Sequence, residues 1–269
     1  MNTPTLSANH LSAGYDGKKI LSDLSLSIPE NKITVIIGAN GCGKSTLLKT
    51  FSRLIRPSQG HILLNGNEIS ALPPKKVAQN LGLLPQSPAA PGGIAVTDLV
   101  ARGRFPYRQF LKNMTNEDFK AVEEAMEIMG ITNLADRNVD ELSGGQRQRV
   151  FIALALAQQT GILLLDEPTT YLDISYQIEI LDLLTDLNQK RKTTIVMVLH
   201  DINLSARYAD YLFAMKKGTL AAHGTPEEII TPELMNKIYG IDCLVMKDPV
   251  SDTPFIIPKG RHHNTDTNV

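Results

Sequence analysis

Residues 38–46 read GANGCGKST and constrain the fold more than any other part of the chain. The string fits the pattern G-x-x-x-x-G-K-[ST]. It follows an apolar run, ITVII at 33–37, and precedes apolar residues at helical spacing over 44–55. A buried strand, a glycine-rich turn and a helix in this order predict a loop that wraps around phosphate groups. A chance glycine-rich turn is the alternative, and the flanking strand and helix argue against it.

The residue types of this loop match that chemistry. Its glycines let the backbone curl so that several N–H groups point at phosphate oxygens. Lys44 supplies a positive charge for the β- and γ-phosphates, and Ser45 offers a hydroxyl to Mg²⁺. Cys42 is either a thiol sensitive to alkylation or a small residue that the loop tolerates. The candidate nucleotide-binding residues of the loop are Gly38, Ala39, Asn40, Gly41, Cys42, Gly43, Lys44, Ser45 and Thr46.

A second apolar run, at 162–165, ends in the acidic pair Asp166 and Glu167. A strand of this kind places its last carboxylates at the edge of a parallel sheet where ligands bind. Asp166 suits the shell of Mg²⁺, and Glu167 is the candidate general base for an attacking water. A solvated surface pair is the alternative and fits four preceding apolar residues poorly. His200 follows the run at 195–199; such a histidine is usually structural, but at this edge it could reach a γ-phosphate.

Residues 142–146 read LSGGQ and precede an apolar helix. Ser143 is predicted to cap this helix, and Gly144 and Gly145 leave its N–H groups open to a ligand. An ordinary capped helix would explain SGG alone but not the whole string. The chain is therefore predicted to carry a second anion site at a helix N-terminus.

The remaining patterns define the surroundings of these sites. Apolar runs alternate with amphipathic helices such as 174–187, which predicts a mostly parallel α/β sheet, while 87–158 reads as a helical insertion.

Lysine plus arginine (27) balances aspartate plus glutamate (28), which argues against a nucleic-acid-binding protein. Two distant cysteines, no signal-peptide core and no apolar run long enough to span a bilayer favour a reducing cytosol. Any work at a membrane would need partners.

GANGCGKST, LSGGQRQR, ILLLDEPTTYLD and LHD, in this order, resemble the ABC ATPase family over nearly the whole chain. The resemblance implies a P-loop α/β core with a mostly parallel sheet, N-terminal antiparallel edge strands and a helical subdomain. We expect one domain over 1–257, followed by a frayed polar tail over 258–269. Within that domain we expect a core formed by 1–86 and 159–240 and a helical subdomain over 87–158. A short C-terminal extension is expected over 241–257.

The resemblance also implies roles for single residues. Tyr15 in SAGYDGKKIL looks like the aromatic residue that stacks on adenine, and Gln86 in LLPQ like the glutamine that contacts Mg²⁺ and senses the γ-phosphate. Asp173 looks like the aspartate that crosses the dimer contact, and His200 like the switch histidine. The candidate catalytic residues are Lys44, Glu167 and His200, the candidate metal-binding residues are Ser45, Gln86 and Asp166, and the candidates for contact with a partner's nucleotide are Ser143, Gly144, Gly145, Gln146 and Asp173.

By the same resemblance we expect a head-to-tail dimer that binds ATP and Mg²⁺. Each ATP would lie between the phosphate loop of one copy and the LSGGQ segment of the other. Both sites have all their motifs, so we expect both to be active.

The rest of the sequence indicates which branch of the ABC ATPase family the chain resembles. One motif set, no long heptad run and no membrane span point to the separate ATPase subunit of a bacterial importer. GIAVTDLVARGRFPY (93–107) and DEPTTYLDISYQIEILDLL (166–184), with Tyr171 in place of a small residue, resemble the importers of ferric siderophores, haem and vitamin B12. Ferric siderophores match best. Vitamin B12 or haem is the alternative cargo, and a soluble ABC ATPase that remodels a protein complex, as in iron–sulfur cluster assembly, is the alternative class.

The expected partners are a second copy, two permease subunits and, indirectly, a substrate-binding protein, at the cytoplasmic face of the bacterial inner membrane. No nucleic acid is expected. Residues 102–112 contain Arg102, Arg104, Arg108 and Lys112 without an acidic residue. This stretch is either a docking face for the permease and the anionic leaflet or a solvated basic turn.

Overall fold

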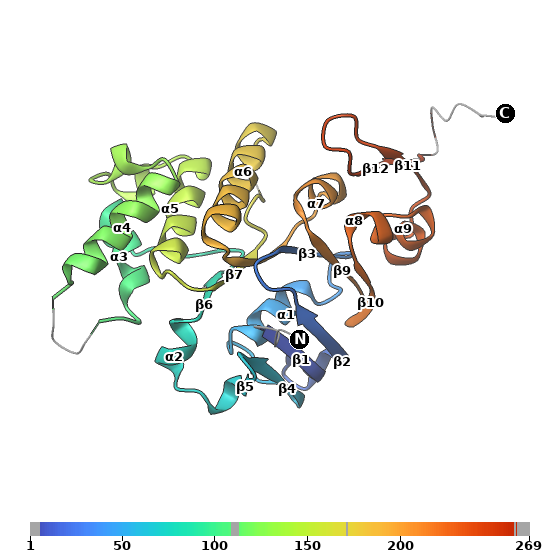
Figure 1. The fold of residues 1–269 in the computed structure, drawn as a ribbon, viewed down its shortest axis with the longest axis horizontal. Coiled ribbons are helices and arrows are strands. Elements are labelled where there is room, and N and C mark those ends of the chain that lie inside the picture. Colours follow the sequence, from blue (N-terminus) through green and yellow to red (C-terminus); the bar gives the residue numbers. More distant parts are fainter. Residues whose placement is uncertain (1–5, 109–112, 171, 261, 263–269) are drawn as a thin grey trace.

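The computed structural model describes residues 6–108, 113–170, 172–260 and 262. Its centre is a six-stranded sheet of order β10-β9-β3-β8-β7-β6, in which only β10 runs antiparallel to its neighbour (Figure 1). The mostly parallel sheet expected from the sequence is confirmed. The strands are β3 (Ile33–Ile37), β6 (Leu81–Leu84), β7 (Ile162–Asp166), β8 (Thr194–Val198), β9 (Tyr211–Lys216) and β10 (Thr219–Gly224).

Both faces of this sheet are buried, which explains why its strands read as unbroken apolar runs. In β7, Leu163 and Leu165 point into one hydrophobic core, while Ile162 and Leu164 point into another. Alternate residues of a strand face opposite sides, so a strand between two cores has no face exposed to solvent, and most of its positions are apolar.

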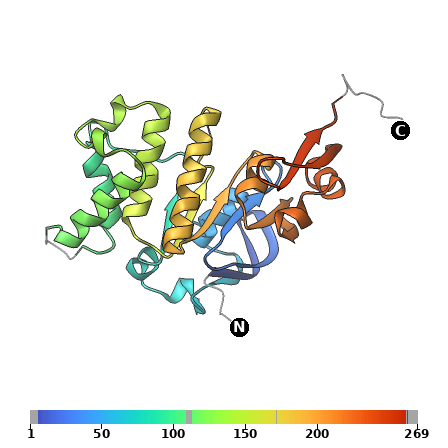
Figure 2. The ribbon, with the colours of Figure 1, turned by 45° about the horizontal axis from the view of Figure 1, so that its top comes forward.

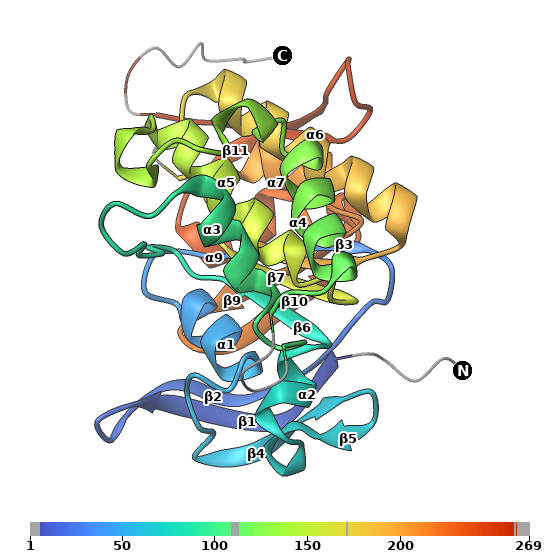
Figure 3. The same cartoon turned by 90° about the vertical axis from the view of Figure 1, so that its left-hand side faces the viewer.

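The N-terminal strands form an antiparallel sheet of their own, of order β2-β1-β4-β5. It packs with helix α1 against one face of the central sheet, at the bottom of Figure 3. The predicted antiparallel N-terminal strands are therefore confirmed, but they form a separate sheet and not the edge of the central one. These elements are β1 (Leu6–Tyr15), β2 (Lys18–Ile28), α1 (Lys44–Phe51), β4 (Gln59–Leu64) and β5 (Asn67–Glu68), followed by the short helices η1 (Ile69–Ala71) and α2 (Pro74–Ala78).

Helices cover the opposite face and one end of the molecule, at the left of Figures 1 and 2. The expected helical subdomain is present, and its exact limits at 87 and 158 stay a prediction. The helices are α3 (Val96–Ala101), η2 (Arg102–Arg104), α4 (Asn116–Ile128), η3 (Thr132–Leu134), η4 (Val139–Glu141), α5 (Gly144–Ala157) and α6 (Ile174–Arg191). None of the helices within the described ranges combines the length and apolarity needed to cross a bilayer.

The C-terminal part adds a two-stranded hairpin at the other end of the molecule. Asn203 fixes it to α7, because its side chain accepts from the N–H of Ile256 at 2.8 Å and donates to the carbonyl of Ile256 at 3.3 Å. The predicted frayed tail over 258–269 lies mostly outside the described residues. The elements are α7 (Ile202–Tyr208), α8 (Pro226–Ile229), α9 (Pro232–Tyr239), β11 (Cys243–Lys247) and β12 (Pro254–Pro258).

Two details of the predicted helices were wrong. The helix expected over 44–55 ends at Phe51, because Arg53 adopts a left-handed backbone with φ 63° and closes the last turn. Leu54 is consequently 65% exposed instead of facing the core. Ile174 opens α6 as expected but is 75% exposed, so it does not belong to the apolar face of that helix.

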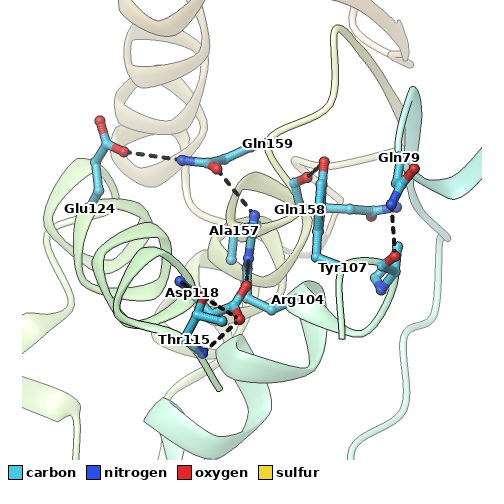
Figure 4. Close-up of polar contacts among 10 residues, drawn as sticks. Gln79, Arg104, Tyr107, Thr115, Asp118, Glu124, Ala157, Gln158 and Gln159 are labelled. Atoms are coloured by element: carbon cyan, nitrogen blue, oxygen red, sulfur yellow. Dashed lines mark hydrogen bonds and ion pairs between the residues drawn. The ribbon is translucent and has the colours of Figure 1, made fainter. Parts of the chain in front are cut away.

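The basic stretch 102–112 is not uniformly a surface feature. Arg104 is 5% exposed, lies 2.8 Å from Asp118 Oδ1 and donates to the carbonyl of Ala157 at 2.8 Å (Figure 4). Its guanidinium therefore joins η2, α4 and α5 inside the helical part. Among the basic residues of this stretch that the structure describes, Arg102 and Arg108 are exposed and available to a docking face; Lys112 lies outside the described residues.

Candidate active site

The glycine-rich loop links β3 to α1 at the carboxyl edge of the central sheet. A Cβ on Gly38 would lie 2.4 Å from the carbonyl oxygen of Met215, so only glycine fits there. Gly43 precedes α1 with φ 108°, a conformation that L side chains rarely adopt. The loop shape therefore depends on glycine at both positions.

Lys44 is 6% exposed and is held over this loop. Its ammonium donates to the carbonyl oxygens of Gly38 at 2.6 Å and Ala39 at 3.3 Å. Its charge thus lies within the curl of the loop, where phosphate oxygens would meet it.

A cavity of about 560 Å³ opens beside the loop and gathers most of the predicted site. Its lining brings residues from four distant segments, with Tyr15, Gln86, Glu167 and His200 among them, next to the phosphate loop. Gly38, Ala39 and Cys42 belong to the loop but do not line the cavity. The lining residues are Tyr15, Ile20, Asn40, Gly41, Gly43, Lys44, Ser45, Thr46, Gln86, Glu167, Thr170 and His200.

Asp166 lies behind the loop, within reach of Ser45. The hydroxyl of Ser45 donates to Asp166 Oδ1 at 2.9 Å. Asp166 Oδ2 is buried without a hydrogen-bond partner among the described residues. Burial, with a further contribution from the charge of Glu167, raises the pKa of Asp166. A hydroxyl and an unsatisfied carboxylate oxygen fit Mg²⁺, a hard cation that prefers oxygen ligands.

Glu167 is the most constrained side chain of the site. It is 8% exposed, and its backbone is left-handed with φ 56°. Three groups hold its carboxylate: Gln86 Nε2 donates to Oε2 at 2.8 Å, the hydroxyl of Thr170 donates to Oε2 at 3.0 Å, and His200 Nε2 lies 2.6 Å from Oε1. Strain of this kind persists where the surrounding structure over-determines it, commonly at functional sites.

Opposing effects set the protonation state of Glu167. Burial raises its pKa, but the hydrogen bonds from His200, Thr170 and Gln86 outweigh burial and lower the pKa below its ordinary value of 4.5. The side chain is therefore ionised near pH 7. An ionised carboxylate fixed beside the phosphate loop is suited to accept a proton from water.

Two residues of the cavity were missed from the sequence. Ile20 on β2 gives no signal that separates it from other apolar strand residues. Thr170 follows Glu167 by three residues, a spacing at which a hydroxyl can return to the carboxylate, and this signal was available.

Cys42 and Cys243 are both free and buried. Burial raises the pKa of the Cys42 thiol, although Lys44 acts in the opposite direction. The reactive thiolate is therefore disfavoured, which supports the reading of Cys42 as a tolerated small residue.

The LSGGQ segment forms the first turn of α5, and the predicted cap is confirmed. Ser143 Oγ accepts from the N–H of Gln146 at 3.3 Å, and the Gln146 side chain accepts from the N–H of Ser143 at 3.2 Å. Asp173 precedes α6 and its side chain makes no cap bond. Ser143, Gly144 and Asp173 are exposed, and neither they nor Gly145 and Gln146 line the cavity of their own chain.

A glycine-rich loop between strand and helix, a buried lysine, a Ser–Asp pair and a fixed glutamate at the edge of a parallel sheet define a P-loop ATPase. Residues 21–170 match the model of the ABC transporter family, and the chain belongs to this family.

Three known proteins illustrate the relationship. The ferric enterobactin transport ATP-binding protein FepC of Escherichia coli is 50% identical, with 95% of this chain and 94% of FepC covered. The iron(3+)-hydroxamate import ATP-binding protein FhuC of Bacillus subtilis is 47% identical, with 93% of each chain covered. The dimeric structure of MJ0796, a bacterial ABC transporter cassette, superposes with a TM-score of 0.72 at 27% identity and covers 82% of this chain and 98% of that one. The predicted fold, family and ATPase class are thereby confirmed.

Proposed function

We propose that this chain is the ATP-hydrolysing subunit of a bacterial importer that takes up a ferric siderophore. The ATPase activity is supported above all by Glu167, whose ionised carboxylate is held by three groups beside the phosphate loop. The cargo is supported by FepC and FhuC, whose names state transport of ferric enterobactin and import of iron(3+)-hydroxamate.

In this proposal the phosphate loop binds the triphosphate. Its N–H groups and the N-terminal end of α1 receive the phosphate oxygens, and Lys44 binds the β- and γ-phosphates. Tyr15, 44% exposed at the rim of the cavity, stacks on the adenine ring.

Ser45, Asp166 and Gln86 would hold Mg²⁺. When bound, Mg²⁺ neutralises charge that develops on the phosphate oxygens during transfer. Ser45 and Asp166 already lie within hydrogen-bond distance of each other, and Gln86 reaches the same edge through its bond to Glu167.

Glu167 serves as the general base. It accepts a proton from the attacking water while the water oxygen bonds to the γ-phosphorus and the bond from that phosphorus to the β–γ bridging oxygen breaks. ADP and phosphate are the products. His200 and Gln86 orient the carboxylate through the contacts described above.

The second anion site is used by a second copy of the chain. Ser143, Gly144, Gly145, Gln146 and Asp173 lie outside the cavity of their own chain, so they complete a site only across an interface. MJ0796 was solved as a dimer. A head-to-tail pairing of identical chains about a two-fold axis places two ATP molecules in equivalent, active sites.

We further propose that the dimer binds two permease subunits at the cytoplasmic face of the bacterial inner membrane and acts indirectly with a substrate-binding protein. The family to which the chain belongs supports this arrangement.

Growth of a deletion strain under iron limitation, with one ferric siderophore at a time as iron source, tests the proposal. We expect one siderophore to fail, the wild-type gene to restore growth, and Lys44→Ala not to restore it. Lys120→Ala, which removes an exposed lysine of α4, is the matched control and should restore growth. Growth on every siderophore, with loss of growth on haem or of vitamin B12 uptake instead, would reassign the cargo.

A further inference from the structure

The first turn of α5 contains two adjacent glycines, Gly144 and Gly145. Glycine loses more conformational freedom than other residues when it enters a helix, so this turn is intrinsically weak. A Cβ on Gly144 would meet nothing within 4 Å, which leaves that side of the turn open to a ligand. The turn needs support from elsewhere if it is to present a fixed set of N–H groups.

The ring of Tyr176 provides a contact on Gly145. A Cβ built on Gly145 would lie 3.4 Å from Cγ and Cδ1 of the ring and 3.6 Å from Cδ2, so the ring lies over the side of this glycine from which a side chain would start. Tyr176 stands in the first turn of α6, three residues after Asp173. The ring therefore joins the start of the LSGGQ helix to the start of α6.

Arg149 supports the same contact one turn along α5. Its guanidinium carbon lies 5.7 Å from the centre of the Tyr176 ring, and the guanidinium is ion-paired with Glu179 of α6. Gly145 and Arg149 are four residues apart on α5, and Tyr176 and Glu179 are three apart on α6, so each pair lies on one helix face. The side chain of Arg149 is 13% exposed, which favours a fixed position.

We propose that Tyr176 is a positioning residue for the second anion site. Its ring fixes the first turn of α5 relative to the start of α6, so that the LSGGQ segment and Asp173 reach the ATP of the partner copy together. This inference rests on the ATP-bound dimer of the proposed function. Tyr176 does not line the cavity beside the phosphate loop of its own chain, so we expect nucleotide binding by one copy not to depend on the ring.

The test uses the full chain with Glu167→Gln, which slows hydrolysis so that the ATP-bound state persists. Two quantities are measured: binding of a fluorescent ATP analogue to dilute protein, and ATP-dependent dimerisation by analytical ultracentrifugation. Addition of Tyr176→Ala should weaken dimerisation about 10-fold, since an aromatic contact of this kind is worth roughly one power of ten in an equilibrium constant. Affinity for the analogue should stay within about twofold, because the phosphate loop keeps its own contacts.

Two variants serve as controls. Tyr176→Phe keeps the ring and should dimerise like the parent. Phe119→Ala removes a ring of α4 that is 59% exposed and should also dimerise like the parent. If Tyr176→Ala does not fold, Tyr176→Leu replaces it, because leucine keeps apolar bulk at this position. Tyr176→Leu should also weaken ATP-dependent dimerisation, since it lacks the flat ring.

The outcomes separate this inference from the proposed function. Dimerisation of Tyr176→Ala at the strength of the parent would overturn the role of the ring, as would an equal loss of analogue binding or an equal effect of Phe119→Ala. Failure of the Glu167→Gln parent itself to dimerise with ATP would overturn the dimer and the inference with it.

Discussion

Replacement of Glu167 by glutamine tests the assignment of the general base directly. Gln86 and Thr170 donate to Oε2, and His200 Nε2 lies 2.6 Å from Oε1, so the carboxylate is surrounded by donors. An amide has the same shape but is neutral, so its oxygen accepts hydrogen bonds more weakly than a carboxylate does, and its NH₂ group cannot accept at all. The variant therefore loses the base and weakens the hydrogen bonds around this side chain, while the phosphate loop is unchanged.

We expect turnover of Glu167→Gln to fall by roughly 10²–10⁴-fold, the usual contribution of a positioned base. ATP binding should be kept or become tighter, because a negative charge beside the triphosphate is removed. Phosphate release at saturating ATP and Mg²⁺ measures the first quantity, and a fluorescent ATP analogue measures the second. Glu123→Gln, an exposed carboxylate of α4, is the control. Turnover of Glu167→Gln within about threefold of wild type would remove Glu167 from the chemistry.

The pH dependence of this variant follows from the hydrogen bonds. Burial raises the pKa of Glu167, and the bonds from His200, Thr170 and Gln86 lower it further than burial raises it. A group with a lowered folded pKa stabilises the fold above its unfolded pKa and loses that contribution as the pH falls through the folded value. The difference in unfolding free energy between wild type and Glu167→Gln should therefore be largest above pH 4.5 and narrow in more acidic solution. An equal difference at all pH values would contradict this account.

Three further changes are predicted. Lys44→Ala should weaken binding of a fluorescent ATP analogue at least about 10-fold through loss of charge-assisted bonds, with Lys120→Ala as control; unchanged binding would refute the loop assignment. Burial raises the pKa of Asp166 in the folded state above its pKa in the unfolded state. The free energy of unfolding therefore decreases as the pH rises from the unfolded-state pKa through the folded-state pKa, because the buried carboxyl group is then ionised. Asp166→Asn should raise the unfolding free energy at pH 7 by roughly 0.5–2 kcal/mol while abolishing turnover, and a loss of stability there would refute the reasoning. Arg104→Met should cost about 3–5 kcal/mol in urea unfolding, because Asp118 is left buried and unpaired, whereas the exposed Arg102→Met should cost under about 0.5 kcal/mol.

The phosphate loop was predictable because its signals are local. The apolar run of β3, the glycines and the helical spacing after Lys44 lie within about twenty residues and dictate one strand–loop–helix unit. The acidic pair after β7 was predictable for the same reason, since a buried strand must deliver its last side chains to the sheet edge.

The partners of Arg104 were not predictable from its neighbourhood. The stretch 102–112 contains no acidic residue, so local charge indicates a solvated face or a docking face. The carboxylate of Asp118 comes instead from the first turn of α4, where the capping box with Thr115 fixes it toward Arg104 (Figure 4). Only the packing of α4 against η2 creates this pair, and no periodicity in the sequence encodes that packing.

The left-handed backbone of Glu167 shows a second limit of sequence reasoning. A residue with a side chain in this conformation costs of order 1–3 kcal/mol, and local preference would have predicted an ordinary strand end. The cost is offset only after folding, when Gln86 from the end of β6, Thr170 from the following turn and His200 from the end of β8 reach the same carboxylate. Each hydrogen bond to a charged group contributes roughly 1.5–3 kcal/mol, so the three bonds together oppose both the strain and the cost of burying the carboxylate. The strained backbone thus persists because these groups meet at the phosphate loop, and the same meeting is what makes Glu167 a fixed, ionised base.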